Sequence, residues 1–390
     1  MLVRNYTLDQ DPPYKTAKAA LEKKFPNVTV NLEGLGYDDT RNKTLITVGA
    51  NQPLDVVQLD YIWIGEYAEG GVLQKISDKV KASDIPSDTL PQFLESSVWN
   101  GEYYAVWVNT DVRTIGWVKE HVAAAGLDPE KAPATYRELI ANAMKAQKPP
   151  GVSGYFFPLI SGESTVERWL TPLFAAGGKI VNDDFTKAAF NSAEGKKALQ
   201  FYVDAVNKYK IVPKVAFESE EVTALMWNKR LVYCFDMGVW ENASEAGWSQ
   251  ERYKKEYGIG VPPKYEGGKI ATTSGGYQLG IPRTSADRDM AWEFIKLATA
   301  AENVKDWYIA QSRLGTRKSL TKFDGEFRRS NPDYATQVEA LKYTQFAPWN
   351  PEWIKMLDPL YTAIQKATLQ QASVAQALAE AEKAVNEILK

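Results

Sequence analysis

Cysteine and histidine are almost absent from this chain, which holds one of each among its 390 residues. Cys234 lies in the apolar run 231–235, which predicts a buried strand, so it has no internal disulfide partner and we expect a small core residue. His121 has no cysteine or histidine near it in sequence, and we expect it to pack in or on a helix over residues 117–125. The sequence therefore predicts neither a disulfide framework nor a metal centre, and nothing in it calls for a cofactor.

Long hydrophobic runs are also absent. No apolar stretch approaches the roughly 18 residues that a membrane-spanning helix needs. Met1 is followed almost at once by an expected strand, without the charged and apolar regions of an export signal and without a lipidation cysteine. The chain is therefore expected to be either cytosolic or an exported protein from which the signal has been removed.

The chain also lacks a large excess of either positive or negative charge. Forty-six basic side chains face 49 acidic ones, which gives a net charge of -3. No segment gathers the stripe of lysine and arginine that binding to a phosphate backbone needs. Nucleic acid is therefore not an expected partner.

Aromatic residues are abundant, with 12 Trp and 20 Tyr. Both side chains pair a large apolar ring with one polar group, which suits a site for a polar ligand with an apolar face. The length favours two domains. Strand-like and helix-like segments alternate, which is typical of an α/β fold with helices packed on largely parallel sheets.

The expected elements follow from hydrophobic spacing, turn residues and caps. We expect strands over residues 3–8, 28–32, 54–59, 101–108 and 277–281. We expect helices over residues 14–25, 39–50, 135–147, 166–176, 193–209, 220–229 and 286–301, and two more in the last forty residues. Thr135 with Glu138, and Ser373 with Gln376, have the spacing of capping boxes.

Eight short segments along the chain resemble known sequence elements in their order and content. Phe25 to Val30 (FPNVTV) is similar to an F-P-x-I-x-V opening, and the segment 126–139 is similar to G-L-x-x-P-x-T-W-x-E-L with Tyr136 in place of Trp. The other segments are 52–57, 67–73, 100–106, 175–178, 227–240 and 291–295, of which 100–106 departs by Val106 where proline is common. Together they resemble the family 1 extracellular solute-binding proteins, the maltose-binding-protein-like receptors of ABC importers.

The resemblance implies a periplasmic-binding-protein fold with two lobes, a mainly parallel sheet with flanking helices in each, and a hinge of three segments. It implies an amino-terminal lobe from residues 1–110 and 274–315, and a carboxy-terminal lobe from residues 111–273 and 316–390. The implied function is a receptor that closes on a sugar in the cleft between the lobes and delivers it to the membrane permease subunits of an ABC importer. It also implies a monomer that works outside the cytoplasm, either periplasmic or extracellular, and that is membrane-anchored in some relatives. The alternative ligand is a non-sugar solute such as a polyamine or glycerol phosphate.

An enzyme is the rival class. The sequence has no G-x-S-x-G nucleophile turn, no phosphate-loop spacing and no metal-ligand cluster. A glycosidase needs two carboxylates across the scissile bond, but an abundance of acidic residues does not indicate such a pair. We therefore expect no catalysis, with a carbohydrate hydrolase as the less favoured alternative.

A sugar cleft needs aromatic platforms and polar groups at the edges of sheets. Asp60, Tyr61 and Trp63 follow the third expected strand and are candidates, although one of the two rings should pack inward. Asp9 and Asp11 lie in the equivalent first loop, where plain turn residues before Pro12 are the alternative.

The chain crossings and later loops supply the other candidates. The family often carries a carboxylate at the first crossing, so Asp111 is expected to face the ligand, with Arg113 close behind. Glu163 opens a helix, and ordinary capping is its alternative role. Trp240 is expected to end a buried strand and resembles the family's sugar-stacking tryptophan, with a core tryptophan as the alternative. The weaker candidates are Gly276, Tyr277, Trp349 and Trp353.

Overall fold

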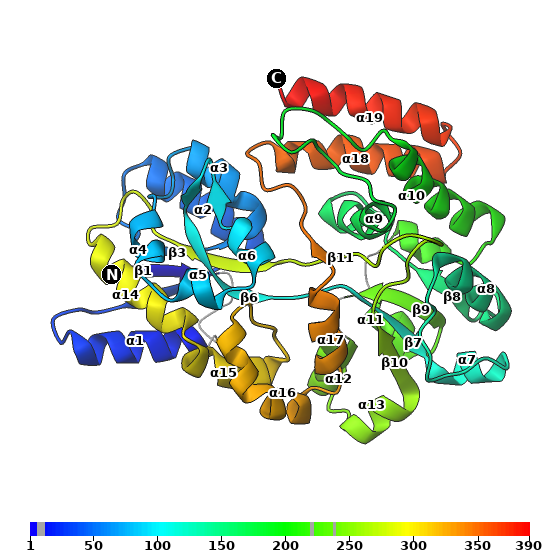
Figure 1. Ribbon diagram of the computed structural model, residues 1–390, viewed down its shortest axis with the longest axis horizontal. Helices are drawn as coiled ribbons and strands as arrows, with labels where there is room; N and C mark the ends of the chain where they lie inside the picture. Colours follow the sequence, from blue (N-terminus) through cyan, green and yellow to red (C-terminus); the bar gives the residue numbers. More distant parts are fainter. Residues whose placement is uncertain (6–11, 219–221, 237–238) are drawn as a thin grey trace. The chain divides into compact units, whose positions relative to one another are not determined.

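The computed structural model describes residues 1–5, 12–218, 222–236 and 239–390, and the chain divides into two compact units (Figure 1). The first unit contains Met1–Asp111, Gly275–Asn331 and Trp349–Pro351. The second unit contains Val112–Ser274, Pro332–Pro348 and Glu352–Lys390. No helix of the described part is long and apolar enough to cross a membrane.

The sheet of the first unit has the strand order β2-β1-β3-β12-β6. β1 (Leu2–Asn5), β2 (Asn31–Gly34) and β3 (Val56–Asp60) pair in parallel. β12 (Gly276–Gly280) pairs antiparallel with both β3 and β6 (Ala105–Thr110), so β6 runs in the same direction as the first three strands. The carboxyl ends of these four strands and the start of β12 therefore lie at one edge, which we call the first-unit edge.

Helices cover both faces of this sheet, as alternating strands and helices predict. α1, α14 and α15 lie on one side of the strands in Figure 1, and α2 and α3 lie on the other. Asp287 fixes the start of α14, because its carboxylate accepts hydrogen bonds from the N–H groups of Asp289 and Met290. The helical segments of this unit are α1 (Pro12–Lys24), α2 (Tyr37–Gly49), η1 (Tyr61–Trp63), α3 (Ile64–Glu69), α4 (Ser77–Lys81), α5 (Ile85–Asp88), α6 (Pro91–Glu95), α14 (Arg288–Thr299), α15 (Ala301–Gln311), η4 (Lys318–Phe323) and α16 (Asp324–Ser330), and a short hairpin is formed by β4 (Val98–Trp99) and β5 (Glu102–Tyr103).

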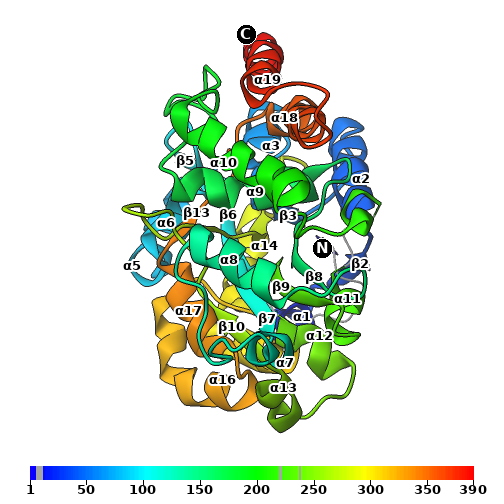
Figure 2. The same cartoon turned by 90° about the vertical axis from the view of Figure 1, so that its right-hand side faces the viewer.

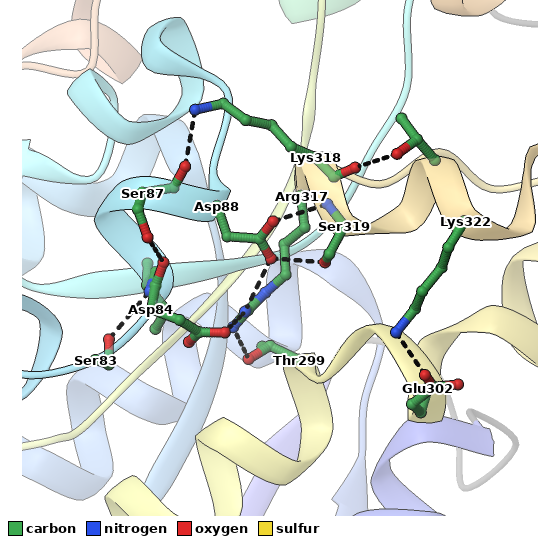
Figure 3. A network of polar contacts seen from close by, with 12 residues as sticks. Ser83, Asp84, Ser87, Asp88, Thr299, Glu302, Arg317, Lys318, Ser319 and Lys322 are labelled. Carbon is green, nitrogen blue, oxygen red and sulfur yellow. Dashed lines mark hydrogen bonds and ion pairs between the residues drawn. The ribbon is translucent and has the colours of Figure 1, made fainter.

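A polar network keeps the segment after α15 in the first unit. The Arg317 guanidinium lies 3.1 Å from the Asp84 carboxylate and 3.4 Å from the Asp88 carboxylate (Figure 3). Asp88 also accepts hydrogen bonds of 2.7 Å from both the N–H and the hydroxyl of Ser319. The segment after α15 is thereby tied to α5, and the chain leaves the first unit only after Asn331.

The sheet of the second unit has the order β10-β7-β9-β8. β8 (Ser153–Phe156) and β9 (Leu231–Asp236) are parallel, and β7 (Thr114–Val118) is antiparallel to both β9 and β10 (Tyr257–Gly260). Each of the two larger sheets is thus mainly parallel with one reversed strand, and that strand follows a crossing of the chain between the units. The carboxyl ends of β8, β9 and β10 and the start of β7 form what we call the second-unit edge.

Helices of the second unit begin at hydroxyl caps in several places. The Thr135 hydroxyl accepts a hydrogen bond from the N–H of Glu138. Ser373 forms with Gln376 the full capping box that the sequence predicted. α18 and α19 pack side by side near the end of the chain (Figure 2). The helical segments are α7 (Lys119–Ala124), α8 (Tyr136–Ala146), α9 (Glu163–Ala175), α10 (Ala193–Val203), η2 (Asp204–Lys208), η3 (Lys214–Phe217), α11 (Thr223–Trp227), α12 (Val239–Glu245), α13 (Gln250–Glu256), α17 (Tyr334–Leu341), α18 (Trp353–Thr368) and α19 (Val374–Ile388), and β11 (Thr272–Thr273) pairs with β13 (Thr344–Gln345).

The expected α/β architecture is confirmed, with differences at element boundaries. Trp117 belongs to strand β7 and not to the helix expected around it, because its backbone pairs with Tyr233 and Gly258. His121 packs in α7, where its Nε2 lies 2.7 Å from the carbonyl oxygen of Lys229. Cys234 is buried in β9, as predicted.

Candidate functional site

A carboxylate and an aromatic ring meet at the first-unit edge. Asp60 ends β3, and its Oδ2 accepts a 3.0 Å hydrogen bond from the Tyr37 hydroxyl at the start of α2. Its Oδ1 accepts a hydrogen bond from the N–H of Ile62 in the helical turn η1 that follows the strand. The Tyr37 ring lies 4.8 Å from the Trp63 ring, centroid to centroid, and both Tyr37 and Asp60 are half-buried. The edge therefore presents an oriented acceptor beside a partly exposed ring.

Tyr277 lies directly opposite Asp60 in the pairing of β12 with β3 and is half-buried. Its neighbour Gly276 is buried and has a φ of 128°, which side chains rarely adopt. A Cβ at this position would lie 2.5 Å from the carbonyl oxygen of Asn109. Gly276 is thus required by the backbone, whereas Tyr277 offers a ring and a hydroxyl at the edge.

Trp349 is the remaining half-buried aromatic candidate. Its indole Nε1–H donates a 3.1 Å hydrogen bond to the carbonyl oxygen of Val98, and its own carbonyl oxygen accepts from the N–H of Gly65 at 3.0 Å. Both ends of the residue are therefore fixed within the first unit. A fixed, partly exposed indole is suited to stacking on a ligand.

Four other aromatic candidates lie in the packed interior of their own units. Tyr61 is 5% exposed and its ring stacks 5.7 Å from that of Trp107, and Trp63 is 2% exposed. Both rings after β3 therefore pack inward, where only one was expected to. Trp353, at the start of α18, is also buried.

Trp240 is the fourth of these interior aromatic candidates, and the sequence predicted its secondary structure wrongly. It lies in the first turn of α12 and not at the end of a strand, because β9 already ends at Asp236. Its ring is 6% exposed and packs 5.3 Å from Tyr253 in an edge arrangement. Its backbone N–H lies 3.3 Å from the carboxylate of Asp333, which also accepts a 2.7 Å hydrogen bond from the Tyr253 hydroxyl.

Charged side chains gather at the second-unit edge. Arg113 precedes β7 and is 5% exposed, and its guanidinium lies 2.5 Å from the carboxylate of Glu167 in α9. Arg168 lies 3.2 Å from the same carboxylate and 3.0 Å from the Ser164 hydroxyl. Burial acts to raise the pKa of Glu167, but the two guanidinium groups outweigh it and hold this pKa below its ordinary value. Arg113 is therefore committed to a buried ion pair.

Of the other four candidate carboxylate groups, the structure describes two. Asp111 lies at the first crossing, where its Oδ1 accepts a 2.9 Å hydrogen bond from the N–H of Gly275. Glu163 is the half-buried first residue of α9, after the carboxyl end of β8. Asp9 and Asp11 lie outside the described residues.

The sequence interpretation missed Tyr37 and Asp333. Tyr37 follows the second strand just as Tyr61 follows the third, so the rule applied to one strand end would have found the other. Asp333 carries no local signal, because its partners lie 80 residues and more away in sequence. Among the described residues, no group of three or more His, Cys, Asp or Glu side chains could hold a metal ion.

A surface pocket of about 780 Å³ lies at α7 and α13 of the second unit. Its lining includes four basic and four acidic side chains and no aromatic ring: Lys119, Glu120, Ala123, Pro129, Glu130, Lys229, Ser249, Glu251, Arg252, Lys255 and Glu256. Many of these charges are paired, as in the contacts of Lys229 with Glu120 and Glu256. None of the predicted site residues lines this pocket, and it lacks the stacking surface of a sugar site.

Several proteins are similar to this chain in sequence or structure. A solved cyclic α-maltosyl-1,6-maltose binding protein from Arthrobacter globiformis is 23% identical with a TM-score of 0.87, over 100% of this chain and 98% of that one. An ABC transporter solute-binding protein from Thermotoga lettingae, bound with α-D-tagatose, is 24% identical with a TM-score of 0.84 over the same shares. A Sinorhizobium fredii protein named as an amino-acid ABC transporter periplasmic-binding protein is 25% identical over 301 residues, 74% of this chain and 67% of its own length.

The sequence model of one family covers most of the chain. It is described as bacterial extracellular solute-binding protein and matches residues 8–305. The TM-scores show that this chain shares its overall fold with the solved proteins. This chain belongs to the family of bacterial extracellular solute-binding proteins.

Proposed function

We propose that this protein is the high-affinity receptor of an ABC importer and that its ligand is a sugar, either a monosaccharide or an oligosaccharide. It works outside the cytoplasm, as the name of its family implies, and it hands the ligand to membrane permease subunits. It acts as a monomer and catalyses no reaction.

The first-unit edge is the observation that carries the sugar proposal. Tyr37, Tyr277 and Trp349 are half-buried aromatic residues in this unit, and Asp60 supplies a carboxylate between strand ends. Sugars offer C–H faces to aromatic rings and hydroxyl groups to carboxylates, so these residue types match that ligand class. The two similar solved proteins, one bound with α-D-tagatose and one a cyclic α-maltosyl-1,6-maltose binding protein, support the same class.

We propose further that both units contribute to the ligand site and that they close on the ligand. The connectivity supports this, because only Asp111, Val112 and Arg113 separate the end of β6 at the first-unit edge from the start of β7 at the second-unit edge. Glu163, at the start of α9, is the contribution we assign to the second unit. Such a two-sided site is the usual location of ligands in proteins built from two domains.

A ligand panel tests the proposed class. A ligand that binds only the folded protein stabilises it by RT ln(1 + [L]/Kd), about 4 kcal/mol at a thousand times Kd, which raises the melting temperature measurably. Monosaccharides and oligosaccharides are expected to raise it, and to be recovered unchanged after incubation. A shift with amino acids, polyamines or glycerol phosphates alone would contradict the sugar proposal, and new sugar products would indicate a hydrolase.

The role of Trp349 can be tested with a matched tryptophan. Trp349→Ala is expected to weaken binding of the sugar by about 1–3 kcal/mol, the usual scale for a stacking residue. Trp99 is the control, because it is also half-buried in the first unit, with its Nε1–H 2.6 Å from Glu69, but is not among the candidates. Calorimetry on both alanine variants should show a loss for Trp349 only, and equal affinities would remove Trp349 from the site.

A further inference from the structure

Asp333 occupies a position where an aspartate normally caps its own helix. It precedes α17, and its backbone carbonyl oxygen accepts a 3.0 Å hydrogen bond from the N–H of Gln337 in that helix. An aspartate at such a position usually turns its carboxylate onto the first N–H groups of the same helix. The carboxylate of Asp333 makes no such bond to α17, whose residues the structure describes in full. The side chain therefore serves another part of the second unit.

The carboxylate of Asp333 instead joins α17 to α12 and α13 (Figure 1). Its Oδ2 accepts a 2.7 Å hydrogen bond from the Tyr253 hydroxyl of α13 and a 3.3 Å hydrogen bond from the backbone N–H of Trp240 in α12. The ring of Tyr253 also packs on the ring of Trp240, and all three residues are buried. The start of α12 is thus held by a carboxyl group that lies 93 residues further along the chain.

A carboxyl group is a costly choice for this place. Burial raises the pKa of Asp333 to about 6, although the Tyr253 hydroxyl, the N–H group of α12 and the charge of Lys254 act to lower it. Two further titratable groups lie near the Tyr253 hydroxyl, the Cys234 thiol of β9 and the Tyr257 hydroxyl of β10. An asparagine could accept the same two hydrogen bonds without burying a charge. The acidity of the side chain therefore points to a functional role.

The start of α12 is close in sequence to the second-unit edge. Strand β9 ends on this edge at Asp236, and only residues 237 and 238 separate it from Val239, where α12 begins. β8 is the parallel neighbour of β9, and it is followed by Glu163, which we assign to the ligand site. Ligands of such sheets bind at the carboxyl ends of the strands. A displacement of the start of α12 therefore alters the edge at which we place the ligand.

We propose that Asp333 is a positioning residue of the ligand site, whose negative charge holds the start of α12 in the arrangement that binds the ligand tightly. A charged carboxylate accepts the N–H of Trp240 more strongly than a protonated carboxyl group does. The affinity for the ligand therefore rises as the pH rises and Asp333 loses its proton. Because Asp333 is buried, it acts through α12 and does not contact the ligand. The inference rests on the proposed function, since it requires a ligand at this edge.

Calorimetry between pH 5 and pH 7.5 tests the proposal, with the monosaccharide or oligosaccharide that gives the largest melting shift in the panel. The wild-type affinity is expected to rise about fivefold over this range, the usual difference between a hydrogen bond to a charged group and one to a neutral group. Asp333→Asn keeps an oxygen acceptor without the charge, so it should show the low-pH affinity of the wild type at every pH. Parallel pH profiles for the two proteins would overturn the proposal.

Asp55 provides the matched control. It is also a buried aspartate that accepts hydrogen bonds from backbone N–H groups, those of Leu2 at 2.7 Å and Ala286 at 3.2 Å. It precedes β3 and so lies at the amino end of that strand, away from the first-unit edge. Asp55→Asn is expected to leave the pH profile of sugar binding unchanged. A change as large as that in Asp333→Asn would show that the loss of any buried carboxylate disturbs binding, and the specific role of Asp333 would be wrong.

A measurement without ligand separates this inference from the proposed function. The backbone amide signal of Trp240 is followed by nuclear magnetic resonance in protein labelled with ¹⁵N-tryptophan, and it is assigned by its loss in Trp240→Phe. The signal is expected to shift with a midpoint near pH 6 in the wild type and to stay constant in Asp333→Asn. A wild-type signal that does not titrate would overturn the positioning role. If no sugar binds, the proposed function fails, whereas this titration still shows whether Asp333 controls the start of α12.

Discussion

Asp333 is a carboxyl group enclosed almost completely by the second unit, with 1% of its surface exposed. Burial raises its pKa to about 6, although the Tyr253 hydroxyl, the Trp240 N–H and the charge of Lys254 all act to lower it. A proton is therefore bound more tightly in the folded chain than in the unfolded one. The protonated Asp333 carboxyl group therefore adds to the stability of the folded state. This added stability is complete below pH 4 and is lost as the pH rises through 6.

This gives a prediction for Asp333→Asn, which keeps the shape of the side chain but removes its titration. The difference between a folded pKa of about 6 and the ordinary 3.8 corresponds to about 3 kcal/mol. The unfolding free energy of the wild type, relative to the variant, should fall by roughly that amount between pH 4 and pH 7. Urea unfolding at several pH values measures it, and a difference that does not depend on pH would show that Asp333 keeps its ordinary acidity.

At the residue scale, the sequence indicates which residue types form a site better than it indicates which side chains are exposed. The order of strand ends correctly pointed to Asp60 and its neighbours as edge residues. It did not predict that Tyr61 and Trp63 both pack inward, because the direction of a ring depends on partners such as Trp107 and Tyr37 in other elements. Whether the half-buried candidates bind ligand stays a prediction.

At the scale of elements, the segment Trp349–Pro351 is held in the first unit by one glycine of α3. A Cβ at Gly65 would lie 2.4 Å from the carbonyl oxygen of Trp349 and 2.7 Å from the nitrogen of Pro351. These are backbone atoms, so the clash can be relieved only by moving the segment. The position of Trp349 therefore depends on the absence of a side chain at residue 65.

Gly65→Ala is accordingly expected to destabilise the protein by about 1–3 kcal/mol, the usual cost of overpacking. Because the substitution moves Trp349, it is also expected to weaken ligand binding. Gly49 is the matched control, because it lies in helix α2 of the same unit and nothing lies within 4 Å of its missing Cβ. Gly49→Ala should be neutral or slightly stabilising. Thermal unfolding of both variants measures the contrast, and similar melting temperatures would show that the segment adapts to residue 65.

Local signals predicted capped helix starts well, but they assigned some residues to the wrong kind of element. Thr135 and Ser373 cap helices as expected, since a cap is a contact between residues close in sequence. Trp117 was placed in a helix although its backbone belongs to β7, because strand pairing with Tyr233 is a contact between distant residues. Local sequence also wrongly indicated that Trp240 ends a strand, because contacts between distant residues leave no local signal.

At the scale of the whole molecule, the lobe bounds that the resemblance implies stay a prediction. In the structure, the first two crossings between the compact units lie after Asp111 and after Ser274. Both lie between strands, where a change of sheet is visible in the pattern of elements. The third lies after Asn331, because the contacts of Arg317 and Ser319 with Asp88 keep the intervening residues in the first unit. Side-chain contacts of that kind leave no mark on the local sequence.

The proposed two-sided site predicts that the separation of the two units changes when a ligand binds. A ligand that contacts both units binds the closed state better than the open one and shifts the population towards it. Moving the ratio of closed to open from 1:99 to 99:1 requires about 5.5 kcal/mol of differential binding, which a high-affinity ligand can supply. Small-angle scattering should therefore give a smaller radius of gyration at saturating sugar than without it. Trp349→Ala at the same sugar concentration should show a smaller change because less of it is bound, and a wild-type radius that stays constant at saturation would contradict closure.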